Sequence, residues 1–112
     1  MPWAVEAEFK ESVRLRALLA ALSACGDDER LLRFLRDLLT PVELRKVSNR
    51  WAAACLLMGS LPEAAVAKRL KISGSTVNDA HQWVRAETYG TGAFREVYVE
   101  IHEALPAELR SD

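Results

Sequence analysis

The sequence predicts an all-α protein with six helices in a single domain spanning residues 1–112. Three observations predict this class: apolar residues recur at three- and four-residue steps, no stretch alternates convincingly with period two, and capping motifs punctuate the chain. Half of the 112 residues are hydrophobic, which suffices for one packed core. With only 5 Gly and 4 Pro, the composition excludes disorder and a turn-rich β-sandwich.

The first helix is expected from Val5 to Leu22, and Gly26 is expected to stop it. A helix of about twenty residues is roughly 30 Å long, whereas a compact chain of this length has a radius of gyration of about 13 Å. The remaining short helices cannot fully cover such a rod, so its wide apolar stripe predicts packing against a second copy. Asp27 or Asp28 then caps a second helix.

Four further helices follow from capping and stop signals. Thr40-Pro41-Val42-Glu43 is a capping box that starts the third helix at Pro41, and Gly59 is expected to end it. Ser60-Leu61-Pro62-Glu63 repeats the same pattern and predicts a fourth helix from about Leu61 to Leu70. Ser73 caps a fifth helix that Tyr89-Gly90-Thr91-Gly92 breaks, and the last helix, from Phe94 to Leu105, stops near Pro106.

The fourth and fifth helices carry the spacing of a helix-turn-helix within about residues 61–86. Ala67 must be small because the two helices touch there, and Ile72 plugs the turn between them. The other residues predicted to pack across the crossing are Val66, Leu70, Val77 and Ala80.

The face of the fifth helix opposite Val77 and Ala80 is polar and suits base edges in the major groove of double-stranded DNA. The residues expected to contact DNA are Lys68, Lys71, Ser73, Gly74, Ser75, Thr76, Asn78, Asp79, Gln82 and Arg85, with Arg69 beside them. Asn and Gln suit adenine, Asp can accept from cytosine, and the cations neutralise phosphates. His81 is expected either to contact a phosphate or to be exposed without a role.

Two features oppose DNA binding. Lys71 occupies a turn position often held by glycine, and a left-handed conformation there would cost about 1 kcal/mol. The second feature is Asp79, which places a negative charge near phosphates.

Asp79, the net charge of −1 and the six acidic against two basic residues of 87–112 suggest an alternative interpretation. The chain would then be a protein-interaction or dimerisation module that keeps the scaffold and has lost specific DNA binding.

Other functions find little support. The chain shows no arrangement of a nucleophile and a base, so no catalytic residue and no enzyme activity are predicted. Cys25 and Cys55, with His81 and His102, lack metal-ligand spacing, so no metal site is expected and both cysteines are predicted to be buried thiols. Without a signal peptide or a long apolar segment, the protein is expected to be cytoplasmic and free of the membrane.

Several motifs together resemble the tryptophan-repressor-like family. They are Leu39-Thr40-Pro41-x-Glu43, Arg50-Trp51, Leu56-Leu57-x-Gly59, Ile72-Ser73-x-x-Thr76-Val77 and Gly90-Thr91-Gly92-Ala93-Phe94. The resemblance covers about residues 30–100 and implies an intertwined all-α homodimer that regulates transcription, as a repressor, by reading a palindromic operator. The general helix-turn-helix geometry, for which the Trp repressor is a standard example, spaces half-sites about 34–36 Å apart.

The resemblance also bears on ligand binding. In tryptophan-responsive members, one arginine of the third helix and one of the recognition helix line the corepressor pocket. Arg50 matches the first and is a candidate ligand-binding residue, although a structural ion pair with Glu43 or Asp37 is slightly favoured over this role. Asp79 stands where the second is expected and would repel the carboxylate of tryptophan. No cofactor is therefore predicted beyond a corepressor of unknown identity, while Trp51, Trp83 and Phe94 are expected in the core or at the dimer interface.

Overall fold

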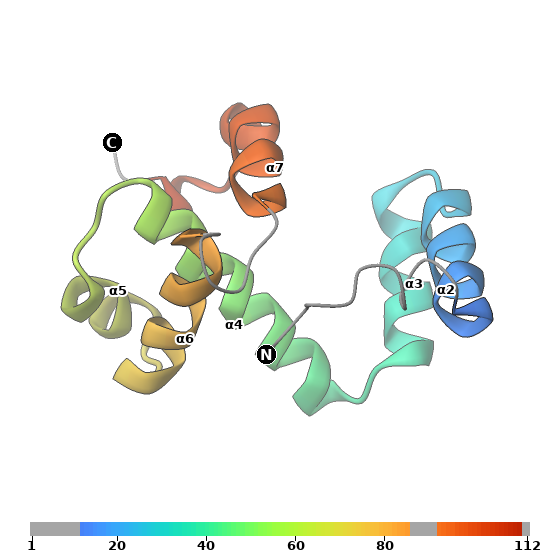
Figure 1. Ribbon diagram of the computed structural model, residues 1–112, viewed down its shortest axis with the longest axis horizontal. Helices are drawn as coiled ribbons and strands as arrows, with labels where there is room; N and C mark the ends of the chain where they lie inside the picture. Colours follow the sequence, from blue (N-terminus) through green and yellow to red (C-terminus); the bar gives the residue numbers. More distant parts are fainter. Residues whose placement is uncertain (1–11, 86–91, 111–112) are drawn as a thin grey trace. The chain divides into compact units, whose positions relative to one another are not determined.

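A computed structural model describes residues 12–85 and 92–110, and this part of the chain is all-helical (Figure 1). It contains six α-helices and two short 3-10 helices, which confirms the predicted class. The elements are α2 (Val13–Ala24), α3 (Asp28–Leu38), α4 (Pro41–Met58), α5 (Glu63–Leu70), α6 (Gly74–Arg85), α7 (Ala93–Ile101), η1 (His102–Ala104) and η2 (Ala107–Leu109). The chain divides into two compact units, Met1–Arg45 and Lys46–Asp112, and the prediction of one domain stays a prediction.

The first unit corrects the predicted helix from Val5 to Leu22. Ser12 has an extended backbone (φ −68°, ψ 116°), and its hydroxyl accepts a 3.2 Å hydrogen bond from the Leu15 N–H, so α2 begins at Val13. Residues 5–11 lie outside the described residues. The 12 residues of α2 span about 18 Å, so the argument for a dimer from the length of this helix fails.

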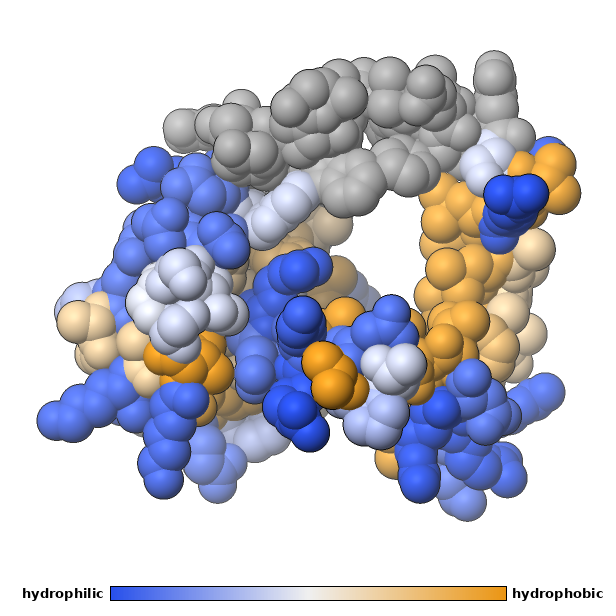
Figure 2. Space-filling model, turned by 90° about the horizontal axis from the view of Figure 1, so that it is seen from below, coloured by the Kyte–Doolittle hydropathy of each residue, from blue (hydrophilic) through white to orange (hydrophobic). Residues whose placement is uncertain are grey.

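Leucine and valine side chains remain at the surface of this unit. Neither α2 nor α3 contains a buried residue, and the exposed fractions of Val13, Leu19 and Leu32 are 71%, 53% and 49%. Figure 2 shows this apolar surface as the orange column at the right of the view. Within one chain, therefore, these two helices leave much of their apolar surface in water.

Capping explains where α3 and α4 begin. Gly26 takes a left-handed conformation (φ 77°) after α2, and the Asp27 carboxylate accepts from the Arg30 N–H at 2.8 Å. At the start of α4, the Thr40 N–H donates to Glu43 (2.8 Å) and the Glu43 N–H donates to the Thr40 hydroxyl (3.1 Å). The stop at Gly26, the cap at Asp27 and the capping box are confirmed.

The predicted capping box at Ser60 is wrong. Ser60 itself is left-handed (φ 75°) and closes α4, because its N–H donates to the Leu57 carbonyl while the Leu61 N–H donates to the Leu56 carbonyl. Pro62 is the N-cap of α5 and provides no side-chain hydrogen bond, so α5 begins at Glu63 rather than at about Leu61. A serine used to end one helix is no longer available to start the next.

The core of the second unit forms where α4, α5 and α6 meet. Its buried residues are Ala53, Leu56, Val66, Val77 and Ala80, each 0% exposed. A second cluster joins Ala54, Met58 and Val84 to the half-buried Trp51 and Phe94, whose rings meet edge to face with centroids 5.2 Å apart. Trp51 and Phe94 thus pack within the core, as expected for one of their two predicted roles.

Cys55 lies in the last turn of α4 and is 0% exposed, while Cys25 is 6% exposed, so both are the buried thiols that the sequence predicts. Burial raises the pKa of the Cys55 thiol to about 11. The thiol of Cys55 therefore stays protonated at neutral pH.

The C-terminal helix is shorter than predicted. Gly92 (φ 90°) is the N-cap of α7, which ends at Ile101 and continues as the 3-10 turn η1 before the buried Leu105. Of the predicted break at Tyr89-Gly90-Thr91-Gly92, only Gly92 is among the described residues. Among the described residues, no helix combines the length and the apolar character needed to cross a membrane.

Candidate nucleic-acid interface

The crossing of α5 and α6 brings the predicted helix-turn-helix residues together. Val66 of α5 and Val77 and Ala80 of α6 are fully buried against Ala53 and Leu56 of α4. Ala67, Leu70 and Ile72 pack against the same cluster while partly buried. Because α4 supports both helices from one side, the opposite side of α6 faces outward (Figure 1).

The turn between these helices depends on Lys71, whose backbone is left-handed (φ 57°, ψ 47°). This conformation lets the Ile72 N–H donate to the Ala67 carbonyl at 3.2 Å, which turns the chain sharply and brings Ile72 back to the core. A residue with a Cβ pays about 1–2 kcal/mol for it. The left-handed conformation considered for Lys71 is therefore present, with its side chain exposed.

Ser73 starts α6 as predicted. Its hydroxyl accepts from the Thr76 N–H at 3.1 Å, and its carbonyl accepts from the Val77 N–H at 3.2 Å. Gly74 follows at the first position of α6, and a Cβ built there would meet no atom within 4 Å. The N-terminal end of α6 is thus narrow and open to the outside.

All ten residues predicted to contact DNA lie at the surface of the described structure. Thr76 and Gln82 are half-buried, and the other eight are exposed: Lys68, Lys71, Ser73, Gly74, Ser75, Asn78, Asp79 and Arg85. Ser75, Asn78, Asp79 and Gln82 follow one another at helical spacing on α6, away from the buried Val77 and Ala80. A groove-binding helix needs this combination of an apolar inner face and a hydrogen-bonding outer face.

Glu63 connects the two helices in a way that the sequence reasoning missed. One carboxylate oxygen lies 2.5 Å from Nδ1 of His81, and the other accepts from Nδ2 of Asn78 at 3.5 Å. The hydrogen bond to His81 is the main cause that lowers the pKa of Glu63 below its usual 4.5. Glu63 was expected to cap a helix, and only the folded chain brings residues 18 positions apart into contact.

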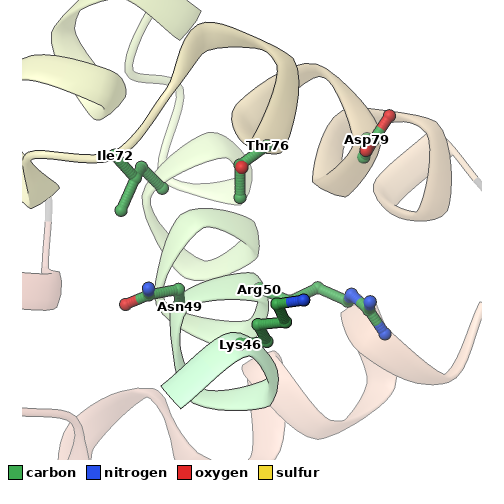
Figure 3. A pocket seen from close by; sticks show the side chains of 6 residues that line it. All are labelled: Lys46, Asn49, Arg50, Ile72, Thr76 and Asp79. Carbon is green, nitrogen blue, oxygen red and sulfur yellow. The ribbon is translucent and has the colours of Figure 1, made fainter. Parts of the chain in front are cut away.

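A pocket of about 230 Å³ lies between α4 and the helix-turn-helix (Figure 3). Lys46, Asn49 and Arg50 line it from α4, and Ile72, Thr76 and Asp79 line it from the turn and α6. Lys46 and Arg50 supply positive charge on one wall, and Asp79 supplies negative charge on the other. The predicted ion pair of Arg50 with Glu43 or Asp37 stays a prediction.

The residue types that bind metals do not cluster in the described part of the chain. Among residues 12–85 and 92–110, no group of three His, Cys, Asp or Glu residues could hold a metal ion. His81, for which the sequence left two roles open, is half-buried and bonded to Glu63.

These features define the class of the protein: it is an all-α helix-turn-helix protein with an exposed polar second helix. The family model described as Trp repressor protein matches residues 13–89, more than half of the chain, and the chain belongs to this family. Membership indicates a DNA-binding regulator of transcription rather than an enzyme. Searches of curated proteins and of solved structures gave no match.

Proposed function

We propose that the chain is a sequence-specific transcriptional regulator, a repressor, that binds a palindromic operator as a homodimer. Helix α6 enters the major groove, where Ser75, Asn78 and Gln82 face base edges. Lys68, Arg69, Lys71 and Arg85 neutralise phosphates on either side. Asp79 accepts from a cytosine amino group in the same groove.

The single observation that carries this proposal is the outward face of α6. On this face Ser75, Asn78 and Asp79 are exposed and Gln82 is half-buried, while Val77, Ala80 and Val84 on the inner face are buried, with exposed fractions of 4% or less. A protein that had kept the scaffold only for dimerisation would have no need of such a face beside a cationic turn. The alternative of a protein-interaction module has no comparable feature among the described residues of α5 and α6.

The second copy is proposed to cover α2 and α3. These helices bury no residue of their own, although they carry exposed leucines and valines. Burying one such side chain contributes about 1.5–3 kcal/mol, and a two-fold axis counts each contact twice. Because a palindromic operator has two equivalent half-sites, a two-fold dimer also matches the DNA.

Control by a small molecule is a second proposal, which rests on the pocket beside α6. With Lys46 and Arg50 on one wall and Asp79 on the other, this pocket suits a ligand whose acid group lies beside Arg50 and away from Asp79. Tryptophan does not fit as in the tryptophan-responsive members of the family, because Asp79 replaces the arginine that would hold its carboxylate. Arg50 is the residue proposed to contact the acid group of the ligand.

Fluorescence anisotropy tests the main proposal. The purified chain is titrated against duplexes from its own upstream region at about 50 and 200 mM salt. Four cations per subunit, Lys68, Arg69, Lys71 and Arg85, predict that log K falls against log salt with a slope of roughly −7 for the dimer. Repeating the titration with L-tryptophan should leave the affinity unchanged. Absence of binding at the lower salt would contradict the proposal, and an increase in affinity with tryptophan would contradict our assignment of Asp79.

A further inference from the structure

Glu63 holds two residues of α6 at once. Asn78 and His81 are three positions apart, so their side chains lie on one face of that helix. Each is bonded to a different oxygen of the Glu63 carboxylate at the start of α5. The side chains of His81 and Glu63 are 31% and 38% exposed, so this contact borders the outer face of α6.

The chemistry of the carboxylate sets the orientation of the Asn78 amide. An ionised carboxylate only accepts hydrogen bonds, whereas the asparagine amide has one donating and one accepting end. Glu63 therefore attracts the NH2 group and repels the carbonyl oxygen. The carbonyl oxygen Oδ1 of Asn78 consequently points away from Glu63.

The charges around Glu63 keep it in the accepting form. The hydrogen bond to His81 lowers its pKa most, desolvation partly opposes this, and smaller contributions from Asn78 and Arg85 lower the pKa further. Glu63 thus stays ionised at every pH at which the protein would bind DNA. A protonated carboxyl group could instead donate to Oδ1 and allow the amide to turn over.

We propose that Glu63 is a positioning residue for base recognition, which fixes the Asn78 amide so that Oδ1 acts as the acceptor presented to DNA. The bases that offer an amino group in the major groove are adenine, through N6, and cytosine, through N4. Asn78 therefore selects adenine or cytosine at its position. This inference rests on the proposed DNA-binding function and adds a residue that does not itself touch the bases.

The test compares base preferences rather than overall affinity. Duplexes enriched from a randomised library by the unmodified chain serve as the probe, together with their variants at each single base pair. The position read by Asn78 is the one whose preference disappears in Asn78→Ala. Glu63→Gln, whose NH2 group can pair with Oδ1, should reduce the discrimination at that position from about 5- to 150-fold to near unity.

Matched variants separate positioning from charge and from folding. Glu100→Gln removes the same charge from an exposed residue of α7 and should leave every position unchanged. Glu63→Asp keeps the charge but is one methylene shorter, so it should lose the same position as Glu63→Gln. If Glu63→Gln fails to unfold cooperatively, Glu63→Asp and His81→Gln carry the comparison.

A spectroscopic measurement gives a second criterion. The side-chain NH2 signals of Asn78 in a ¹⁵N–¹H spectrum should shift as Glu63 is protonated below its usual pKa of 4.5, and should not do so in Glu63→Gln. An unchanged pattern of base preferences in Glu63→Gln, or a uniform loss over all sequences, would overturn the inference while leaving the DNA-binding proposal intact. No DNA binding by the unmodified chain would overturn both.

Discussion

Lys71 combines two roles that oppose each other. Its exposed side chain lies at the turn before α6, where it can neutralise a phosphate, yet its backbone is left-handed (φ 57°), a conformation that glycine adopts without steric cost. The sequence predicted this conflict, because the position between two helices often requires a left-handed residue. The phosphate contact proposed for Lys71 would explain why a lysine, and not a glycine, occupies this strained position.

Lys71→Gly should therefore raise the stability and weaken DNA binding together. Relief of the left-handed strain should raise the free energy of unfolding by about 1 kcal/mol, measured by thermal or urea unfolding. Loss of the cation should weaken binding to all sequences alike and flatten the salt slope by roughly one unit per contact. Lys71→Ala is the matched control: it loses the charge but keeps the strain, so it should show the binding defect without the gain in stability.

At the scale of the elements, the helix caps that depend on residues close together in the chain were predicted well from the sequence. Asp27, Thr40 and Ser73 each cap a helix through hydrogen bonds to residues three positions ahead. The failures involve competition between neighbouring elements. Ser60 closes α4 instead of opening α5, and Ser12 begins a helix inside a continuous apolar pattern.

The candidate site also combines a feature that the sequence predicts with features that it does not predict. Exposure of the outer face of α6 follows from its amphipathic period, whereas the contact of Glu63 with His81 and the pocket beside Arg50 do not. Both depend on the angle between helices, which brings together residues that the sequence separates by 18 positions or more. No local pattern encodes that angle.

The crossing of α5 and α6 can be tested by overpacking. Ala67→Leu adds volume where α5 packs against the core, so it should lower the free energy of unfolding by about 1–3 kcal/mol. It should also weaken DNA binding, because α6 would be displaced. Ala65→Leu places the same side chain at an exposed position of α5 and should change neither quantity. Equal stability of the two variants would show that Ala67 does not limit the approach of the helices.

At the scale of the whole molecule, the proposed dimer would cover the apolar side chains that α2 and α3 leave exposed within one chain. Leu32→Glu places a charge on the proposed interface, at a residue that is 49% exposed within one chain. Because Leu32 is half-exposed, its burial contributes about half of the 1.5–3 kcal/mol of a fully buried leucine, so the two copies together should raise the dissociation constant of the dimer about 10- to 150-fold. Sedimentation equilibrium measures this constant.

Arg33→Glu is the control for that variant, since it changes an exposed polar neighbour on the same helix. It should leave the dimer intact. A dimer that persists unchanged in Leu32→Glu would show that the second copy binds elsewhere.

Because Cys55 is buried, its reaction with thiol reagents can report local unfolding of the protein. Thiol reagents attack the thiolate, of which a group with a pKa of about 11 provides roughly a thousandth at pH 8. Since the side chain is also 0% exposed, alkylation at Cys55 must wait for the C-terminal part of α4 to open. Labelling rates at this one atom would then measure how often the support beneath the helix-turn-helix is lost, without adding any probe to the chain.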